Sequence, residues 1–340
     1  MKMGGMERVL SLLANFAAEE GFDVHIICLI DKIIAYDLDE RINVHGPDRP
    51  YKKGFGNKLK TVFFLRNTLQ KIHPDTALCF SEAFNPVAIM AAKLAGYPIY
   101  ISDRSNPYKK LGKGKELFRK YTYPLAEGMI AQTELAKGVA LDKKYNNNIV
   151  VIPNPLRAID DSIPKKYGKN IVTVGRLVST KNLDELIRVF GEIDNKEWQL
   201  HILGDGDQKE HLEKTIANLN LGNRVKLMGA VKNVDAYFAE ASVFAFPSLS
   251  EGFPNALSEA MAFPLPCIAY DCPAGPADII KDGDNGFLIP MKDTTTFKDK
   301  LETLMDSEMH RNKFIEGSHG YRQKYSAERI VNQFLDFILA

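Results

Sequence analysis

The chain has 340 residues, of which 45% are hydrophobic and 26% charged, and its formal net charge is +1. This length exceeds what one ordinary hydrophobic core holds, so we expect two globular domains. No run approaches the roughly 18 consecutive apolar residues needed to cross a bilayer, and the balanced charge gives no reason to expect a nucleic-acid partner.

The first residues, "MKMGGMERVL", predict a glycine loop followed by a helix, with Val9, Leu10, Leu13 and Phe16 on one helical face. Such a loop normally follows a strand, yet no strand precedes Gly4. We therefore expect the first strand of the N-terminal domain to be missing, which would expose both neighbouring strands. The expected cause is a truncated chain or a start codon placed too late. These residues also lack the basic head and apolar stretch of a signal peptide.

Short β-branched runs alternate with segments of helical length along the whole chain. Strands are predicted at residues 23–30, 76–80, 98–102, 128–132 and 148–152, and again at 170–175, 198–204, 224–229, 242–248, 266–270 and 286–290. Continuous apolar strands between helices are typical of parallel sheets covered on both faces. The sequence therefore predicts an α/β protein made of two doubly wound, Rossmann-like domains.

The four cysteines show no metal-ligand spacing. Three of them sit inside apolar runs, as buried thiols usually do; the four are Cys28, Cys79, Cys267 and Cys272. This pattern, without a signal peptide, favours a reducing cytoplasm.

Residues 51–124 contain 14 lysines and arginines against four acidic residues, and include "YKKLGKGKELFRKY". Such a run can be an ordinary solvated face. It can also be a surface for anionic headgroups or a pyrophosphate-bearing acceptor, with Leu111, Leu117, Phe118 and the tyrosines dipping into the interface. The second interpretation predicts peripheral attachment to the inner face of an anionic cell membrane.

Three prolines and a charged run in "IPNPLRAIDDSIPKKYGKN" separate the two series of strands. We therefore expect a hinge at residues 154–169, with domains at 1–155 and 156–322. The last segment, 323–340, has apolar residues at helical spacing and could pack back on the first domain. These residues are Ile330, Val331, Phe334, Leu335 and Ile338.

Ligands of open parallel sheets bind at the carboxyl ends of the strands, where helix N-termini offer N–H groups to anions. After the strand at 170–175 come Gly175, Arg176 and Lys181. A guanidinium and an ammonium that flank one turn suit a diphosphate. After the strand at 198–204, Gly204 in "GDGDQKE" allows close backbone approach. Each motif alone is also typical of an ordinary surface turn.

The stretch "SEGFPNALSEAMA" after the strand at 242–248 is more informative. Glu251 and Glu259 flank the predicted start of a helix near Asn255. Two carboxylates in this position can accept hydrogen bonds from polyol hydroxyls, and the N–H groups of the loop would point at an anion or at sugar hydroxyls.

Together, "GRLVSTKN", "GDG", "SEGFPNALSEAMA", "DCPAGPADII" and "DGDNGFLIP" resemble the retaining glycosyltransferases of family 4, which have the two-domain GT-B fold. These motifs cover most of residues 170–290 in the family's order and spacing. "GGMERVL", "SDRSNP", "IAQT" and "IPNP" are shorter and weaker matches in the first half. The resemblance implies two Rossmann-like domains facing across a cleft, with the nucleotide sugar bound by the second and the acceptor by the first.

The resemblance also implies roles for single residues. Arg176 and Lys181 would neutralise the donor diphosphate and stabilise it as it leaves, as a metal does elsewhere. Glu259 would bond the ribose hydroxyls, and Glu251 would hold the transferred sugar. Further donor contacts would come from Gly175, Gly204, Gly252, Phe253, Pro254, Asn255 and Ala256.

On the acceptor side the resemblance points to Gly4 and Gly5 of the glycine loop and to Asp103 and Arg104 of "SDRSN". Some relatives carry a histidine at this strand end, whereas the seven histidines of this chain lie elsewhere. A step that depends on histidine is therefore not supported. Arg104 can meet a negatively charged acceptor or form a structural salt bridge.

We therefore expect a retaining transferase that moves a hexose or N-acetylhexosamine from a nucleotide diphosphate, most often UDP, and forms an α-linkage. The expected acceptor is a glycan or a polyprenyl-pyrophosphate-linked oligosaccharide. "DCPAGPADII" resembles bacterial enzymes that extend lipid-linked or surface oligosaccharides, as in lipopolysaccharide or other polysaccharide biosynthesis. No metal or other cofactor is expected.

Other interpretations stay open. Asp-x-Asp triplets at 37–39, 205–207 and 282–284 are compatible with a metal-dependent transferase of another fold. A nicotinamide dehydrogenase is disfavoured, because no G-x-G-x-x-G follows a strand with an acidic residue about 20 positions on. A nucleotide-sugar epimerase would need further carboxylates and a histidine near the cleft. The remaining alternative is a non-catalytic nucleotide-sugar binder or an inactive, truncated transferase.

Overall fold

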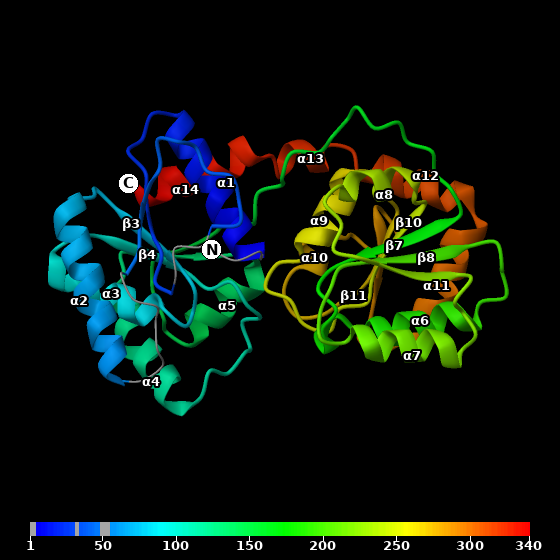
Figure 1. The fold of residues 1–340 in the computed structure, drawn as a ribbon, viewed down its shortest axis with the longest axis horizontal. Coiled ribbons are helices and arrows are strands. Elements are labelled where there is room, and N and C mark those ends of the chain that lie inside the picture. Colours follow the sequence, from blue (N-terminus) through cyan, green and yellow to red (C-terminus); the bar gives the residue numbers. More distant parts are fainter. Residues whose placement is uncertain (1–4, 31–33, 48–54) are drawn as a thin grey trace. The chain divides into compact units, whose positions relative to one another are not determined.

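The computed structural model describes residues 5–30, 34–47 and 55–340 (Figure 1). The chain divides into two compact units. The N-terminal unit comprises Met1–Pro155 and Tyr325–Ala340, and the C-terminal unit comprises Leu156–Lys324. The division after Pro155 falls where the proline-rich sequence places the domain boundary, and the last segment belongs to the N-terminal unit.

The C-terminal unit is built on one sheet of six parallel strands in the order β12-β11-β10-β7-β8-β9. The strands are β7 (Asn170–Val174), β8 (Gln199–Leu203), β9 (Val225–Gly229), β10 (Val243–Phe246), β11 (Cys267–Tyr270) and β12 (Gly286–Ile289). Each agrees with a predicted strand to within two residues, because buried parallel strands are continuous apolar runs that a sequence shows clearly.

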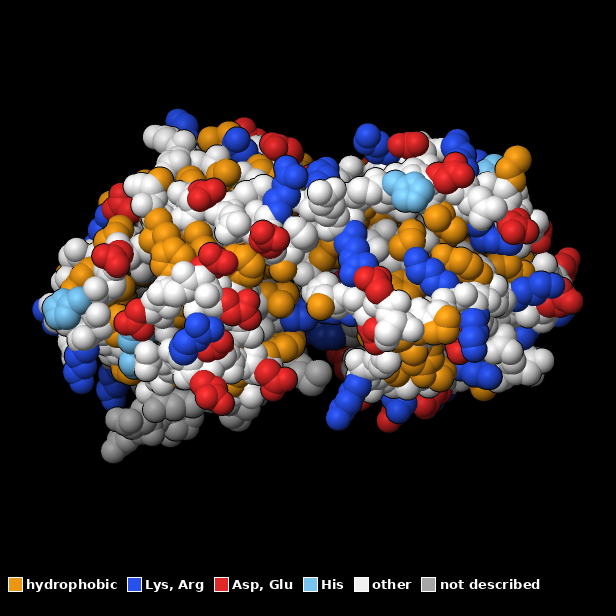
Figure 2. Space-filling model, turned by 90° about the horizontal axis from the view of Figure 1, so that it is seen from above, with side chains coloured by type: hydrophobic (Ala, Val, Ile, Leu, Met, Phe, Trp, Pro, Cys, Tyr) orange, Lys and Arg blue, Asp and Glu red, His pale blue; other side chains and the backbone are white. Residues whose placement is uncertain are grey.

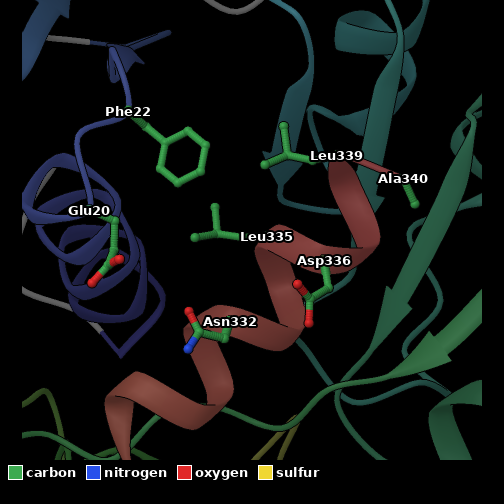
Figure 3. Close-up of a pocket in the computed structure, with 7 residues that line it drawn as sticks. All are labelled: Glu20, Phe22, Asn332, Leu335, Asp336, Leu339 and Ala340. Carbon is green, nitrogen blue, oxygen red and sulfur yellow. The ribbon is translucent and has the colours of Figure 1, made fainter.

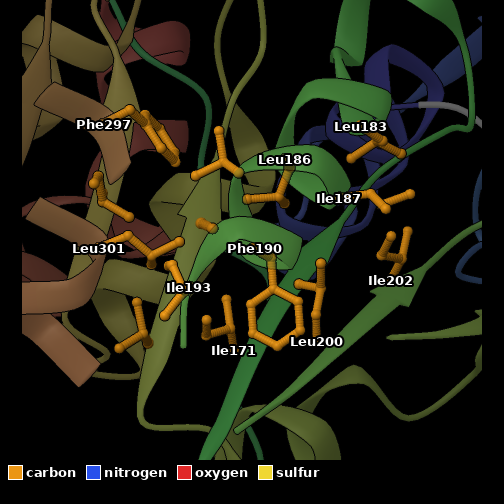
Figure 4. Packing of buried hydrophobic residues seen from close by; sticks show 14 of the residues in the cluster. Ile171, Leu183, Leu186, Ile187, Phe190, Ile193, Leu200, Ile202, Phe297 and Leu301 are labelled. Atoms are coloured by element: carbon orange, nitrogen blue, oxygen red, sulfur yellow. The ribbon is translucent and has the colours of Figure 1, made fainter. Parts of the chain in front are cut away.

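Helices cover both faces of this sheet (Figure 1). Strand β10 shows the two sides, since alternate residues of a strand point to opposite faces. Val243 and Ala245 join the hydrophobic cluster that α6 and α7 help to form (Figure 4), whereas the Phe244 ring meets Phe238 of α8 edge to face at 5.8 Å. The helices are α6 (Leu183–Glu192), α7 (Lys209–Asn218), α8 (Val234–Glu240), α9 (Asn255–Ala262), α10 (Pro276–Ile279), α11 (Thr294–Asp306), α12 (Glu308–Gly317) and α13 (Tyr321–Lys324), with the 3-10 turn η2 (Ser179–Lys181).

The described strands of the N-terminal unit form two parallel sheets. One has the order β3-β4-β5-β6, and the other consists of β1 and β2. Their bounds are β1 (His25–Ile27), β2 (Asn43–His45), β3 (Ala77–Phe80), β4 (Ile99–Ser102), β5 (Gly128–Ala131) and β6 (Ile149–Val151). The sequence predicts five of these strands and misses β2, because its residues Asn43, Val44 and His45 include one apolar side chain and form no apolar run.

Helix α1 (Gly5–Glu19) packs against both of these sheets. Val9 and Leu13 share a hydrophobic cluster with Phe80 of β3, and Ala14 shares another with Ile26 of β1. The strands β1 and β3 thus lie under one helix without pairing with each other, and no strand of the described residues precedes α1. Gly4 of the glycine loop lies outside the described residues, and the missing first strand stays a prediction.

The C-terminal helix completes the core of the N-terminal unit. In α14 (Ala327–Ile338), Ile330, Val331 and Phe334 enter the cluster that contains Phe80. The other helices of this unit are α2 (Phe55–Ile72), α3 (Asn85–Ala95), α4 (Lys113–Thr122) and α5 (Glu134–Asp142), with the 3-10 turn η1 (Tyr123–Leu125). Within the described part of the chain, no helix is both long enough and apolar enough to span a bilayer.

A groove of about 420 Å³ lies between the end of α1 and helix α14 (Figure 3). Because α1 leads directly into β1, this groove sits at the amino end of that strand. Parallel sheets bind ligands at the opposite, carboxyl edge, so we do not place the functional site in this groove. Its lining residues are Glu20, Phe22, Asn332, Leu335, Asp336, Leu339 and Ala340.

Candidate functional site

The strand order of the C-terminal unit reverses between β7 and β10. From β7 the chain runs outward through β8 and β9, and the neighbouring β10 continues outward on the other side through β11 and β12. The crevice outside the carboxyl ends of two such strands is the usual ligand site of a doubly wound sheet. The loops that leave β7 and β10 carry the arginine–lysine motif and the glutamate motif, so the topology brings both motifs to one place.

Side chains of the two loops meet directly. Lys181 Nζ donates a hydrogen bond to Glu251 Oε1 at 2.6 Å, and their side chains are only 19% and 11% exposed. The backbone joins as well, since Leu249 N–H donates to Thr180 O at 2.9 Å. Arg176 follows β7 and is exposed. A half-buried ammonium and an exposed guanidinium therefore stand at the carboxyl end of one strand, as a diphosphate would require.

Two buried polar groups on these loops have no hydrogen-bond partner within the described structure. They are Asn182 Nδ2, at the start of α6, and Ser248 Oγ, after β10. Buried polar groups are nearly always paired, so each orphan calls for an explanation. Both orphans lie on the two loops that meet at this site.

Glu259 lies on α9 and is buried. Its Oε2 accepts a hydrogen bond from Nε of Arg157 at 2.9 Å. Helix α9 begins at Asn255, so the N–H groups of its first turn lie beside the carboxyl end of β10. The loop before it is supported by Gly275, where a Cβ atom would come within 2.1 Å of Pro254 Cδ. Glu259 therefore lies on the helix that follows the loop of Glu251, and its carboxylate is held by Arg157.

Gly204 and Gly206 let the loop after β8 pack on the loop after β7. A Cβ atom on Gly204 would lie 1.8 Å from Gly175 O, and one on Gly206 would lie 2.3 Å from Leu177 O. Leu177 N–H also donates to Asp205 O at 2.9 Å. The close backbone approach seen here is therefore between protein loops, and the contact of Gly204 with a donor stays a prediction.

Asp103, predicted on the acceptor side, lies in a buried polar network of the N-terminal unit. It forms an ion pair with Arg119, and Tyr123 Oη and Asn85 Nδ2 donate hydrogen bonds to it at 2.6 and 3.0 Å. Burial raises the pKa of Asp103, against the effect of Arg119 and Tyr123. These partners give Asp103 a structural role in the packing of α3, α4 and η1 behind β4.

Arg104, the next residue, is bound differently. Its Nη1 donates to Asn154 Oδ1 at 2.7 Å, and its guanidinium lies 3.7 Å from the ring centroid of Phe80. The Nε and Nη2 groups are buried without a hydrogen-bond partner in the described structure. Burial lowers the pKa of Arg104 to about 9, and only Asp103 opposes this shift. Within the described part of the chain Arg104 forms no ion pair, so the alternative of a structural salt bridge is not seen there. Gly5, by contrast, simply begins α1.

The other candidate groups of the sequence serve local structure. Asp39 pairs with Arg41, Asp205 accepts from the N–H of Gly206, and Asp282 accepts from the N–H of Leu288, which accounts for one acid in each Asp-x-Asp triplet. The described residues contain no group of three or more metal-ligating side chains. Arg157 was not predicted, because an arginine in the segment between the two units matches no sequence pattern; its contact with Glu259 appears only in the structure.

Comparison with known proteins bears on both units. Residues 3–158 match the family model described as Glycosyltransferase Family 4, and residues 157–320 match the one described as Glycosyl transferases group 1. The chain is 26% identical over 352 residues to the amylovoran biosynthesis glycosyltransferase AmsD of Erwinia amylovora, covering 98% of this chain and 96% of that protein.

Two further similarities concern lipid-linked substrates and the fold. The chain is 26% identical to a Campylobacter jejuni α-1,4-N-acetyl-D-galactosaminyltransferase that is named for an undecaprenol-diphosphate-linked glycan, over 99% of this chain and 96% of that protein. The crystal structure of Anabaena Alr3699/HepE in complex with UDP has a TM-score of 0.79 and 16% sequence identity, over 98% of this chain and 95% of that one. This last similarity shows the fold, which is GT-B.

Proposed function

The chain is a glycosyltransferase of the GT-B fold, and we propose that it transfers a hexose or an N-acetylhexosamine, with retention, from a nucleotide diphosphate sugar to a glycan or lipid-linked oligosaccharide. One observation carries the donor part of this proposal. The predicted phosphate ligand Lys181 and the predicted sugar ligand Glu251 are in hydrogen-bond contact at the reversal point of the sheet. UDP is the proposed carrier, supported by the UDP-bound Anabaena structure.

The proposed reaction depends on stabilising the negative charge of the leaving diphosphate. When the bond between the anomeric carbon and the diphosphate oxygen breaks, negative charge grows on that oxygen, and we assign the stabilisation of this charge to Lys181 and Arg176. The acceptor oxygen forms the new bond on the same face of the sugar and gives its proton to the departing phosphate oxygen. The result is an α-linkage, and this scheme needs no separate base. In it, Glu251 holds the sugar hydroxyls and Glu259 the ribose hydroxyls.

An anionic acceptor is proposed from Arg104. A buried guanidinium with two unpaired N–H groups can bind a phosphate oxygen, and a lipid-linked diphosphate would supply one. The named substrate of the Campylobacter relative carries such a diphosphate. We propose the same chemical class of acceptor for this chain.

Peripheral membrane binding is proposed from helix α4. Lys113, Leu117 and Tyr121 are spaced by four residues and so share one face, and Lys120 lies beside them. Leu117 and Tyr121 are 56% and 65% exposed, although both are large hydrophobic side chains. On the face of the molecule that Figure 2 shows, acidic and basic side chains are interspersed, and this face is not the proposed membrane contact. A helix with lysines around exposed apolar side chains suits an anionic bilayer surface.

Turnover tests the proposal directly. The protein is incubated with a panel of UDP-sugars and lipid-diphosphate-linked glycans, with and without EDTA, and nucleotide release and product are followed together. We expect one sugar to be transferred and its rate to survive EDTA. Nucleotide release without any acceptor product, or a rate abolished by EDTA and restored by a divalent cation, would contradict the mechanism.

A further inference from the structure

One guanidinium connects two buried carboxylates in the C-terminal unit. Arg157 donates through Nε to Glu259, and through Nη1 and Nη2 to Asp235 at 2.9 and 2.5 Å. The side chains of Glu259 and Asp235 are 6% and 5% exposed, and that of Arg157 is 22% exposed. Two edges of the planar guanidinium are thus occupied by carboxylates from different helices, α9 and α8.

The position of Arg157 is itself fixed. Asp235 Oδ2 also accepts the N–H of Asp160 at 2.9 Å, and Arg157 Nη1 donates to Ala158 O at 2.9 Å. Burial alone would raise the pKa of Asp235, but the hydrogen bonds from Arg157 and Asp160 bring it below its usual range. Asp235 therefore carries a negative charge, and it accepts hydrogen bonds from both Arg157 and Asp160 of the linker segment, residues 156–169.

These contacts restrict Glu259. A glutamate has three side-chain torsions, and a free carboxylate would rotate among several orientations. A planar guanidinium that is held at its other edge donates in a fixed direction and so restricts the orientation of the carboxylate that it meets. Because α9 begins at the crevice outside β10, the orientation of Glu259 decides whether its oxygens face a ligand there.

We infer that Arg157 is a positioning residue of the donor site, which holds Glu259 in the orientation that receives the ribose hydroxyls of the nucleotide. This inference rests on the proposed function and adds to it a residue outside the motifs, in the linker between the units. Arg157 itself does not contact the nucleotide in this account. Its effect is therefore confined to the ribose and does not extend to the diphosphate.

Nucleotide discrimination tests this inference. Dissociation constants of UDP and of 2′,3′-dideoxy-UDP are measured by calorimetry for the unaltered protein and its variants. We expect the unaltered protein to prefer UDP by about tenfold or more, which is the loss expected when a buried acceptor is left without its partners. Glu259→Gln and Arg157→Gln should both remove most of this preference and leave binding of the dideoxy nucleotide nearly unchanged. Arg157→Lys should keep part of it.

A matched control separates positioning from anchoring of the linker. Arg322 Nη1 donates to Asp161 at 2.7 Å and its Nη2 donates to Ile159 O at 3.4 Å, so Arg322 also holds the segment between the units, whereas the hydrogen bond to Glu259 Oε2 comes from Arg157. Arg322→Gln should therefore keep the full preference for UDP. If Arg157→Gln does not fold, as judged by its melting curve, Asp235→Asn is measured instead, since it keeps the shape of the anchor and weakens its hold on Arg157.

The outcomes distinguish the positioning role of Arg157 from the ribose-binding role of Glu259. If Glu259→Gln loses the preference while Arg157→Gln and Asp235→Asn retain it, the inference is overturned and the donor role of Glu259 stands. If the unaltered protein shows no preference and Glu259→Gln changes nothing, the proposed ribose role of Glu259 fails, and the inference about Arg157 fails with it. An equal loss of affinity for both nucleotides would indicate a merely structural role and would also overturn the inference.

Discussion

Replacing Lys181 by alanine tests two roles of this residue, which are to stabilise the leaving diphosphate and to pair with the buried Glu251 in the folded protein. The change removes a charged hydrogen-bond donor from the point where the leaving diphosphate gains charge. Loss of one such donor from an active site typically lowers kcat by about 10² to 10³. We expect a fall of about 100-fold in kcat, which corresponds to about 2.7 kcal/mol of activation free energy, and a smaller rise in the Kd of UDP.

The same change affects stability. Glu251 is only 11% exposed and would lose its partner, which costs about 1–3 kcal/mol in the free energy of unfolding. A second substitution, Glu251→Gln, removes the unpaired charge. The double variant should therefore recover most of the stability but none of the turnover. Lys214→Ala, at an exposed lysine of α7, is the control and should change neither quantity.

Initial rates of nucleotide release and urea unfolding curves measure the two effects separately. If Lys181→Ala kept its rate, or if Glu251→Gln restored turnover in the double variant, Lys181 would not act on the leaving group. If the double variant were no more stable than Lys181→Ala, the energetic interpretation of the pair would be wrong.

Two further predictions concern packing and the membrane. Gly204→Ala should lower the melting temperature by several degrees, because the new Cβ would lie 1.8 Å from Gly175 O and the residue has a φ of +143°. Gly222→Ala is the control: a Cβ there meets open space, and the melting temperature should not change. Equal melting curves for the two variants would refute the loop packing. Leu117→Asp should abolish salt-sensitive binding to vesicles of anionic lipid in a flotation assay and leave binding of UDP unchanged. Binding to neutral vesicles as well as to anionic ones, or no loss on Leu117→Asp, would count against α4 as the contact surface.

Much of the fold could be predicted because it depends on local patterns. The strands of the six-stranded and the four-stranded sheets are apolar runs, and prolines mark the division between the units. The start of α9 at Asn255 follows from the turn that Gly252 and Pro254 form before it. Strand β2 could not be predicted, because its sequence Asn-Val-His has no apolar run and the strand is defined by pairing with β1.

The candidate site was predicted where a motif follows a strand, and missed where contacts are long-range. Lys181 and Glu251 are 70 residues apart, and the strand order alone explains why they meet. The hold of Arg157 on Glu259 spans 102 residues and has no strand-end signal. For Asp103 the sequence showed the strand end but not the arginine that binds the carboxylate there. The sequence indicates which residues lie in the loops at the carboxyl ends of the strands, and only the packed structure shows which side chains they contact.

The most direct test of the account is a crystal structure of the protein with UDP bound. We expect the diphosphate to lie outside the carboxyl ends of β7 and β10, with its oxygens within hydrogen-bond distance of Lys181 Nζ. We also expect the ribose hydroxyls to donate hydrogen bonds to the Glu259 carboxylate. A nucleotide bound at any other strand end, or one whose ribose lies away from Glu259, would contradict it.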